Sequence, residues 1–290
     1  MISVIVSSHK EIDFFGFSQS LFETIGVPYE LIKIENPGQF SISKAYNLGA
    51  EKAKFEYLIF VHEDVVFVTQ GWGIKLMNLY KTHPELGIVG VAGSMKKSSL
   101  PTGWGTGTGE FDRIHLIQIH NKKEEFQSTG KSTDRFEVVR VLDGVFLSTT
   151  KEIWSNFRFD ENLQGYHLYD IDFSLRVSQK WKAIISYEIL LKHFSSGNYN
   201  SDWVDKTLEY HQDKVKSSLF DQHFELVSKS RRAWYKALAF GNINSSLRKK
   251  YLSRMGFDFF SSIHAFAFRF PWFGKKILDR FGISNLPFLH

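Results

Sequence analysis

The chain has 290 residues, of which 43% are hydrophobic and 23% charged, a balance that is typical of a globular protein and excludes a disordered one. The absence of cysteine excludes disulfides and thiolate metal sites and fits a reducing, cytoplasmic compartment. The net charge of +5 is uneven, because residues 201–290 carry 15 Lys and Arg against 8 Asp and Glu, which leaves residues 1–200 at −2. A basic C-terminal part predicts an anionic partner, either lipid headgroups or nucleic acid.

The first two hundred residues alternate between short apolar runs and helical patterns. The apolar runs are residues 2–8, 29–35, 57–64, 86–94, 137–150 and 183–194. Several are hydrophobic on both faces, as expected for strands of a mostly parallel sheet covered by helices. The helical patterns include 42–54 and 11–25, the latter with Ile12, Phe15, Leu21, Phe22 and Ile25 on its apolar face. This order predicts an α/β domain that begins with a strand at residue 2 and not with a signal peptide.

Acidic residues stand at the end of one predicted strand and recur later in the chain. Glu63 and Asp64 end the run 57–64, a second pair is Asp170 and Asp172, and His193 ends the last run. Carboxylates at the rim of a sheet can hold a divalent cation without being buried unpaired. A single acidic pair is explained as well by a strand leaving the core. The second pair and the histidine favour a metal and phosphate site.

Residues 98–112 interrupt the pattern with four glycines around Trp104. So many glycines exclude a regular element and predict a mobile loop, of a length typical of a substrate lid or an acceptor-binding segment. Trp104 is a candidate for stacking on a sugar, although an anchor in the core is the alternative. No Gly-Lys-Ser/Thr follows the glycines, so they do not form a phosphate loop.

From Asp202 onward the pattern is helical, and residues 226–257 contain no acid. The segment 257–276 is rich in phenylalanine but too interrupted to span a bilayer. It predicts an interfacial helix, with Trp272 at headgroup depth and Lys275 and Lys276 beside it, or else a helix packed on the body or in a dimer contact. The predicted domains are therefore 1–200, which is catalytic, and 201–290, a helical, basic and aromatic-rich extension.

Several segments together resemble family 2 inverting glycosyltransferases of the GT-A fold. They are 2–9 (Ile-Ser-Val-Ile-Val-Ser-Ser-His), 32–36 (Ile-Lys-Ile-Glu-Asn), 43–49 (Ser-Lys-Ala-Tyr-Asn-Leu-Gly), 60–65 (Phe-Val-His-Glu-Asp-Val), 141–147 (Val-Leu-Asp-Gly-Val-Phe-Leu) and 169–176 (Tyr-Asp-Ile-Asp-Phe-Ser-Leu-Arg). The match extends from residue 2 to about residue 200, and it is strongest to a bacterial subgroup with His-Glu-Asp in place of Asp-x-Asp. Two residues depart from the usual pattern: Tyr169 replaces an acid, and His62 replaces an aspartate.

The resemblance implies a GT-A fold, described as a Rossmann-like, mostly parallel sheet flanked by helices, and a transferase for nucleotide sugars. It implies nucleotide-binding roles for Ser7, Ser8, His9, Glu35, Lys44, Asn47, His62 and Glu63. It implies Mn²⁺ or Mg²⁺ at Asp64 and His193, acceptor contacts at Asp143 and Gly144, and a catalytic base at Asp170. Trp104 is a further candidate for a sugar contact, because of its aromatic face in the glycine-rich loop. For His193 a merely structural role is the alternative, for Asp170 a helix N-cap, and for Asp143-Gly144 a simple turn. Burial raises the proton affinity of an aspartate, which suits it to be a base.

The expected partners are a UDP- or dTDP-sugar and a glycan or lipid-linked acceptor. Residues 229–276 are a candidate for peripheral contact with the inner face of the cell membrane, with a homodimer contact as the alternative. The Gln-x-x-Arg-Trp signature of processive synthases is absent, which favours single addition. A catalytically silent nucleotide- or sugar-binding protein on the same fold is the second hypothesis. A nucleic-acid binder is the third and is disfavoured, because the tail has no recognition motif.

Overall fold

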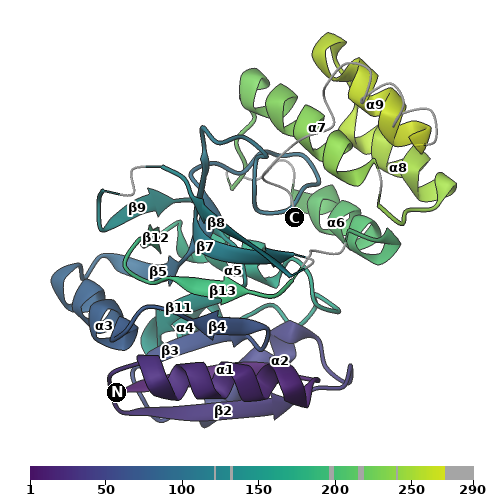
Figure 1. Cartoon of the computed structure of the whole chain (residues 1–290). Coiled ribbons are helices and arrows are strands. Elements are labelled where there is room, and N and C mark those ends of the chain that lie inside the picture. Colours follow the sequence, from purple (N-terminus) through teal and green to yellow (C-terminus); the bar gives the residue numbers. More distant parts are fainter. Residues whose placement is uncertain (121, 131–132, 196–198, 215–218, 240, 272–290) are drawn as a thin grey trace. The chain divides into compact units, whose positions relative to one another are not determined.

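In the computed structural model, the chain forms two compact units (Figure 1). The structure describes residues 1–120, 122–130, 133–195, 199–214, 219–239 and 241–271. The first unit comprises residues 1–95 and 113–195, and the second comprises residues 96–112 and 196–290. The loop around Trp104 therefore belongs to the second unit although the elements on either side of it belong to the first.

The larger sheet of the first unit mixes parallel and antiparallel strands. Its strands, in spatial order, are β2 (Tyr29–Glu35), β1 (Ile2–Ser8), β3 (Tyr57–His62), β11 (Phe146–Thr150), β5 (Leu86–Gly90), β12 (Lys182–Ser186) and β9 (Phe136–Val139). Strand β1 is parallel to both neighbours and β12 is parallel to β5, whereas β11 runs antiparallel to β3 and β5, and β9 antiparallel to β12. The predicted α/β fold is confirmed, with a sheet that is mixed where the sequence predicted mostly parallel pairing.

A smaller sheet combines segments that follow strands of the larger sheet along the chain with a hairpin of two further strands. Its strands are β10 (Val141–Leu142), β6 (Ala92–Ser94), β7 (Asp112–His120), β13 (Leu191–His193) and β4 (Val65–Phe67), and β8 (Lys123–Ser128) pairs with β7. The long runs predicted at 86–94, 137–150 and 183–194 therefore each bend from one sheet into the other. The run 57–64 likewise leaves β3 through a turn at Glu63 and Asp64 and continues as β4.

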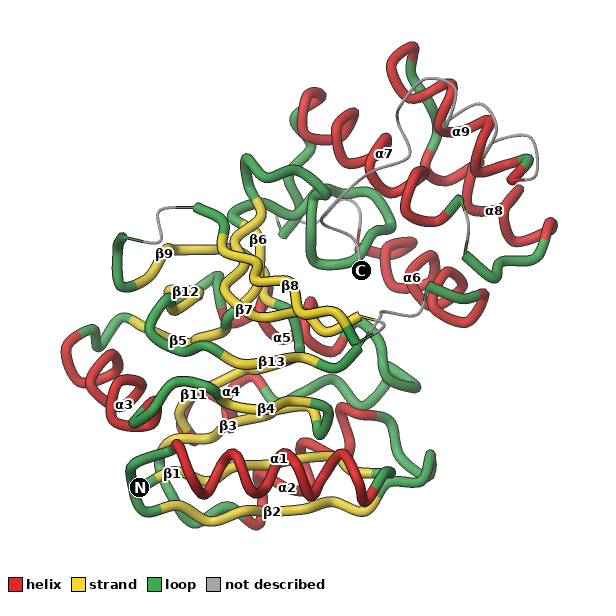
Figure 2. The backbone as a smooth tube through the Cα atoms, in the orientation of Figure 1, coloured by secondary structure: helices red, strands yellow, loops and turns green. Residues whose placement is uncertain are grey.

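The helices of the first unit are α1 (Glu11–Thr24), α2 (Ile42–Lys52), α3 (Trp72–Thr82), α4 (Lys151–Phe157) and α5 (Tyr169–Val177). Figure 2 shows α1 in front of the β1–β2 edge and α2 behind it. Helix α2 packs closely on β1. A Cβ at Gly49 would overlap with Ile5, so the absence of a side chain at Gly49 allows this approach. Ser41 caps α2 by accepting a hydrogen bond from the N–H of Lys44 at 3.3 Å.

The apolar face predicted for α1 is wrong in part. Ile12, Phe15 and Phe22 are 82%, 69% and 75% exposed, and the buried residues are Phe17, Ser20, Leu21 and Thr24. The two buried hydroxyls are paired, since Ser20 Oγ accepts the N–H of Phe67 at 3.1 Å and Thr24 Oγ1 accepts the Trp72 indole N–H at 3.1 Å. Hydrogen bonding thus allows polar residues to face the core, which an apolar pattern does not reveal.

The second unit is mostly helical among its described residues outside the loop 96–112. It contains α6 (Ser201–Lys214), α7 (Phe224–Leu238), α8 (Ser245–Met255), the 3-10 helix η1 (Phe259–Ser261) and α9 (Ser262–Arg269). Its core includes Trp203, Trp234, Tyr235, Tyr251 and Phe268. No helix in the described part of the chain combines the length and the apolar character that crossing a bilayer requires. Trp272, Lys275 and Lys276 lie outside the described residues.

The loop 96–112 contains no helix or strand before β7 begins at Asp112, and it is joined to this helical core. The Trp234 indole N–H donates to the carbonyl of Gly105 at 3.0 Å, and the Tyr251 hydroxyl donates to the carbonyl of Pro101 at 2.7 Å. The carboxylate of Asp112 accepts the N–H groups of Thr106 and Gly107 at 2.8 Å and of Thr108 at 3.1 Å. These contacts hold the backbone of the glycine-rich segment in one defined conformation.

Candidate active site and metal centre

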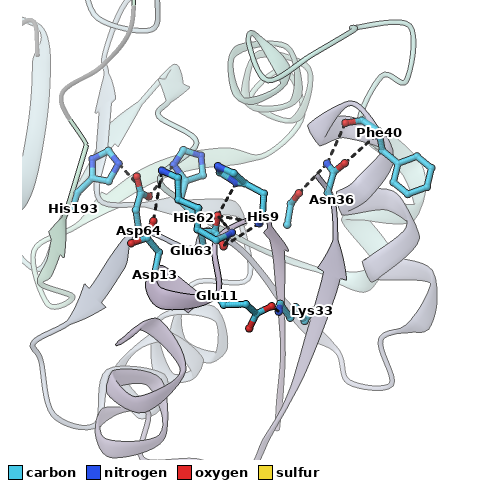
Figure 3. Close-up of polar contacts among 12 residues, drawn as sticks. His9, Glu11, Asp13, Lys33, Asn36, Phe40, His62, Glu63, Asp64 and His193 are labelled. Carbon is cyan, nitrogen blue, oxygen red and sulfur yellow. Dashed lines mark hydrogen bonds and ion pairs between the residues drawn. The ribbon is translucent and has the colours of Figure 1, made fainter. Parts of the chain in front are cut away.

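Strand β3 ends at a buried carboxylate that organises the neighbouring turn. Glu63 is 6% exposed and accepts the backbone N–H groups of His9 and Lys10 at 3.1 and 3.2 Å. Its Oε1 also lies 2.7 Å from Nδ1 of His9 (Figure 3). Glu63, predicted to bind nucleotide, is therefore occupied by the chain itself. It fixes the turn between β1 and α1, which presents His9 and Lys10 to the pocket described below.

Asp64 and two histidines bring three metal-ligating atoms together. His62, Asp64 and His193 each offer an atom within 4.8 Å of the other two. Asp64 Oδ1 lies 3.8 Å from Nδ1 of His62 and 3.7 Å from Nε2 of His193 (Figure 3). These separations are too long for hydrogen bonds, so the buried Asp64 Oδ1 and His193 Nε2 have no hydrogen-bond partner among the described residues.

Buried polar atoms without a hydrogen-bond partner are available to bind a cation, and the donor set fits one. Two imidazoles and one carboxylate are a common ligand set for divalent transition metals with open positions. Burial lowers the pKa of His193, against the opposing charge of Asp64, and so keeps this imidazole neutral as a ligand must be. Asp64 and His193 were predicted as ligands, and the structure brings His62 together with them as a third candidate.

A short series of contacts connects this cluster with Asp170. The hydroxyl of Tyr169 lies 2.7 Å from Nε2 of His62 and donates to the carbonyl of Gly144 at 3.2 Å. The N–H of Gly144 donates to Oδ2 of Asp170 at 3.0 Å. Tyr169 is buried, and a Cβ at Gly144 would overlap with its hydroxyl. Asp64 and Asp170 thus lie at the same edge of the sheet, as the sequence predicted.

Asp170 occupies the first turn of α5 but does not cap it. The N-cap position is Leu168, and no side chain caps this helix end. Burial, and after it the charge of Asp143, raises the pKa of Asp170 to about 7, although backbone N–H groups oppose the shift. Asp143 itself accepts the N–H of Val145 at 2.7 Å, so it forms the predicted turn and also acts on Asp170. Asp172 pairs with Arg176 at 2.7 Å and is directed elsewhere.

A pocket of about 170 Å³ lies beside the cluster. It is lined by Ser7, His9, Lys10, Asp13, Ile42, His62, Glu63, Asp64, Tyr166 and Tyr169. The pocket combines the end of β1, the start of α1, the end of β3 and the start of α5. It thus contains four of the eight residues predicted to bind nucleotide: Ser7, His9, His62 and Glu63.

The other four predicted nucleotide ligands do not line this pocket. Asn47 is buried, and its side chain bonds Phe159, Trp154 and Glu161, which gives it a structural role. Ser8 is 1% exposed, Glu35 pairs with Lys33 at 2.7 Å, and the Lys44 ammonium lies over the Phe40 ring at 5.2 Å. Trp104 is half-buried and belongs to the second unit.

Three residues that line the pocket, Lys10, Asp13 and Tyr166, were not predicted from the sequence. The contact between the Tyr169 hydroxyl and the His62 imidazole was not predicted either. Lys10 directly follows His9, and the carboxylate of Asp13 lies 3.7 Å from the Lys10 ammonium, so the position of both residues just after the first strand was a usable signal. Tyr166 stands in an irregular segment with no motif. Tyr169 was noticed only as a departure from an acidic pattern, because its hydroxyl contact depends on three distant segments.

Two solved structures are similar to this chain. A crystal structure of GalNAc-T7 with UDP, GalNAc and Mn2+ matches with a TM-score of 0.51 at 12% identity. The match covers 99% of this chain, which spans only 58% of that one. A crystal structure of A197 from STIV matches with a TM-score of 0.37 at 13% identity, over 67% of this chain and 86% of that chain. No curated protein matches the chain.

The first of these matches supports the GT-A fold. The sequence model described as "Glycosyltransferase like family" matches residues 3–223. These residues include the three candidate metal ligands, the pocket beside them and Asp170. The chain therefore belongs to the glycosyltransferase-like family.

Proposed function

We propose that this chain transfers a sugar, with inversion, from a nucleoside diphosphate sugar to a hydroxyl of a glycan or lipid-linked acceptor. The observation that carries the proposal is the pairing of two groups at one sheet edge. One is a cluster of three metal-ligating atoms within 4.8 Å of one another, and the other is an aspartate whose pKa is raised to about 7. They are joined through Tyr169 and Gly144.

On the donor side, His62, Asp64 and His193 would hold a divalent cation next to the diphosphate. Such a cation stabilises the negative charge that gathers on the departing phosphate. The 170 Å³ pocket would take part of the nucleotide, with His9 and Lys10 near the phosphates and Tyr166 near the base or ribose. UDP is the favoured nucleotide and dTDP the next, because the structural neighbour was crystallised with UDP.

Mn²⁺ fits the three ligands better than Mg²⁺. Mg²⁺ prefers oxygen ligands in a strict octahedral arrangement, whereas two of the three donors here are imidazole nitrogens. The contact between Tyr169 and Nε2 of His62 leaves Nδ1 to face Asp64, and therefore to face the cation. Tyr169 acts here as a positioning residue, since it holds the imidazole in one orientation.

On the acceptor side, Asp170 would take the proton of the attacking hydroxyl. The acceptor oxygen forms a bond to the sugar carbon while the bond from that carbon to the phosphate oxygen breaks, so attack from the opposite face inverts the configuration. A base with a pKa near 7 is ionised often enough at neutral pH and still attracts a proton strongly. Asp143 and Gly144 would lie near the acceptor, since both contact or influence Asp170.

A thermal-shift panel tests the donor half of this proposal. UDP, GDP, dTDP and CDP are each compared with and without Mn²⁺, and UDP with Mn²⁺ is expected to raise the melting temperature most, because a ligand that binds the native state stabilises it. Asp64→Asn should abolish the part of the shift that depends on Mn²⁺. The absence of a shift with every nucleotide would overturn the proposal.

The competing function is a catalytically silent nucleotide- or sugar-binding protein. The position of Asp170 beside the candidate metal cluster, together with its raised pKa, favours the transferase over this alternative. Donor turnover that disappears in Asp170→Asn while nucleotide binding survives distinguishes the two. We also propose that residues 229–276 contact a membrane surface, with a homodimer contact as the alternative.

A further inference from the structure

The second unit contains an open pocket that plays no part in the proposed reaction. Its volume is about 520 Å³, within the roughly 300 to 1,000 Å³ usual for small-molecule sites. It is formed by the loop 96–112, α7 and α9, all within the second unit. The lining residues are Gly107, Thr108, Glu110, Lys229, Arg232, Ala233, Lys236 and His264.

Several cations of the basic run have structural partners and are not available to a ligand. Arg231 contacts Asp258 at 2.6 Å, and Lys250 contacts Asp205 at 2.8 Å. Arg248 is 4% exposed and donates to four backbone carbonyls, those of Leu238, Gly241, Ile243 and Phe268. A large share of the basic character predicted to attract an anionic surface therefore holds the helices together.

Arg232 and Lys236 differ from these cations. They are four residues apart on α7 and so share one face of the helix. Neither has a hydrogen bond or an ion pair with any residue that the structure describes, and both line the pocket. Lys236 is only 8% exposed, and burial lowers its pKa. Burying an ammonium without a counter-ion costs free energy, so its position in a pocket calls for an anion.

His264 approaches the same place from α9. Its Nδ1 is buried without a hydrogen-bond partner among the described residues. Burial, and after it the charges of Arg232 and Lys236, lowers the pKa of His264, so these three side chains are close together. The pocket thus gathers a guanidinium, an ammonium and an imidazole from two helices.

The remaining polar groups around the pocket are already engaged. Lys229 contacts the carboxylates of Glu110 and Glu225, each at 2.8 Å. The N–H groups of Gly107 and Thr108 donate to Asp112, so the backbone of the loop offers no anion cradle. The hydroxyl of Thr108 contacts that of Thr106 at 3.0 Å. Arg232, Lys236 and His264 are therefore the donors that face a ligand.

We propose that this pocket binds a phosphate group through Arg232, Lys236 and His264. A guanidinium can donate two parallel hydrogen bonds, and an ammonium supplies a compact charge. The several oxygens and the double charge of a phosphate monoester match these separate donors better than a carboxylate does. The phosphate could be a lipid headgroup in a bilayer or part of a free molecule, and the experiment below separates the two.

The first measurement is the binding of inorganic phosphate to the full chain by thermal shift. EDTA is present, so that the metal cluster of the first unit does not respond, and chloride at equal ionic strength is the blank. Phosphate should raise the melting temperature of the wild type. Lys236→Met and Arg232→Gln should each bind phosphate about tenfold more weakly or worse, because each removes a charged donor from a desolvated site.

Lys249→Gln is the matched control, because it removes one charge from an exposed position on α8. It should bind phosphate as the wild type does. Lys236→Met keeps the apolar stem and removes an unpaired buried cation, so it is expected to fold. Equal phosphate affinity in the wild type, Lys236→Met and Arg232→Gln would overturn the proposal, and so would the absence of any shift in the wild type.

Two further probes identify the source of the phosphate. Glycerol phosphate is a free monoester, and phosphatidic acid vesicles present a phosphate monoester on a bilayer, with phosphatidylcholine vesicles as the reference without net charge. A loss of vesicle sedimentation in Lys236→Met, but not in Lys249→Gln, supports the pocket and assigns the headgroup. If Lys236→Met weakens the binding of glycerol phosphate but not the binding of vesicles, the pocket is supported and its ligand is a free compound. The result does not depend on the proposed reaction, because no donor and no metal are present.

Discussion

Asp170 is expected to be more useful to the reaction than to stability. Its pKa is about 7 in the folded chain against an ordinary value of 3.8, so the folded state binds more protons between these pH values. Stability therefore falls as the pH rises through this window, and above it the loss is complete. Asp170→Asn should raise the melting temperature at pH 8 and have little effect at pH 4. The same variant should lose sugar transfer by about 10²- to 10⁴-fold.

Asp172→Asn is the control for Asp170→Asn. This residue lies on the same helix but pairs with Arg176 at 2.7 Å, so its substitution should lower the melting temperature. If Asp170→Asn lowered the melting temperature at pH 8 as well, the raised pKa of Asp170 would be refuted.

Asp143 should set the acid limb of the pH profile. Its charge is the second cause of the raised pKa of Asp170, after burial. Asp143→Asn removes that charge while its amide oxygen can still accept the N–H of Val145. The limb of kcat/KM against pH should therefore move to lower pH, because Asp170 then ionises more easily. A limb that stays in place or moves upward would contradict the assignment of Asp170 as the base.

Tyr169 should influence the metal without touching it. Tyr169→Phe removes the hydroxyl that lies 2.7 Å from Nε2 of His62. Mn²⁺ affinity, measured by calorimetry, should fall by about 10- to 100-fold, as is usual when the partner of a ligating imidazole is lost. Tyr166→Phe removes a hydroxyl from the same pocket and should leave the affinity unchanged. Equal affinities in both variants would show that Tyr169 does not position His62.

At the scale of elements, the start of α5 can pack against the turn between β10 and β11 only because Gly144 in that turn has no side chain. Gly144 allows Tyr169 to approach, since a Cβ there would overlap with the tyrosine hydroxyl and ring. Gly144→Ala should destabilise the chain by about 1–3 kcal/mol, as overpacking does, and should also weaken Mn²⁺ binding. Urea unfolding gives the first quantity and calorimetry the second.

Gly16 provides the opposite case within α1. A Cβ at Gly16 would meet nothing within 4 Å, and the residue lies inside a helix. Gly16→Ala should therefore stabilise the chain by about 0.5–1 kcal/mol. If both glycine variants changed stability in the same direction, the close approach of Tyr169 to Gly144 would not be the cause.

The positions of strands and helices were largely predictable, whereas their bends were not. The runs 2–8 and 29–35 became β1 and β2 with the predicted bounds, because an apolar run reports local burial. The run 183–194 became two strands, because the point where a strand leaves one sheet for another depends on distant partners. Because the ends of the apolar runs are visible in the sequence, the sequence located Asp64, His193 and Asp170 at the sheet edge. It did not show that Glu63 and Asn47 are used within the chain.

At the scale of the whole molecule, the two units should respond separately to a local change. Asp112 accepts three N–H groups of the glycine-rich loop, and this loop belongs to the second unit. Asp112→Ala should increase hydrogen exchange in the loop and in α7, whose Trp234 bonds Gly105, and leave β1 and β3 protected. Glu110→Gln, which breaks an exposed ion pair with Lys229, is the control and should change little. Exchange that rises equally in β1 would mean that the two units unfold as one.

The path of the chain between the units limits how this protein can be divided. The backbone passes from one unit to the other at Met95, at Asp112 and again at Ser195. A gene cut once after Ser195 would discard the helices but leave the loop 96–112 behind, with the indole and phenol donors of Trp234 and Tyr251 removed. The helical part is therefore unsuited to exchange between proteins by simple fusion, and we expect both parts to have been inherited together.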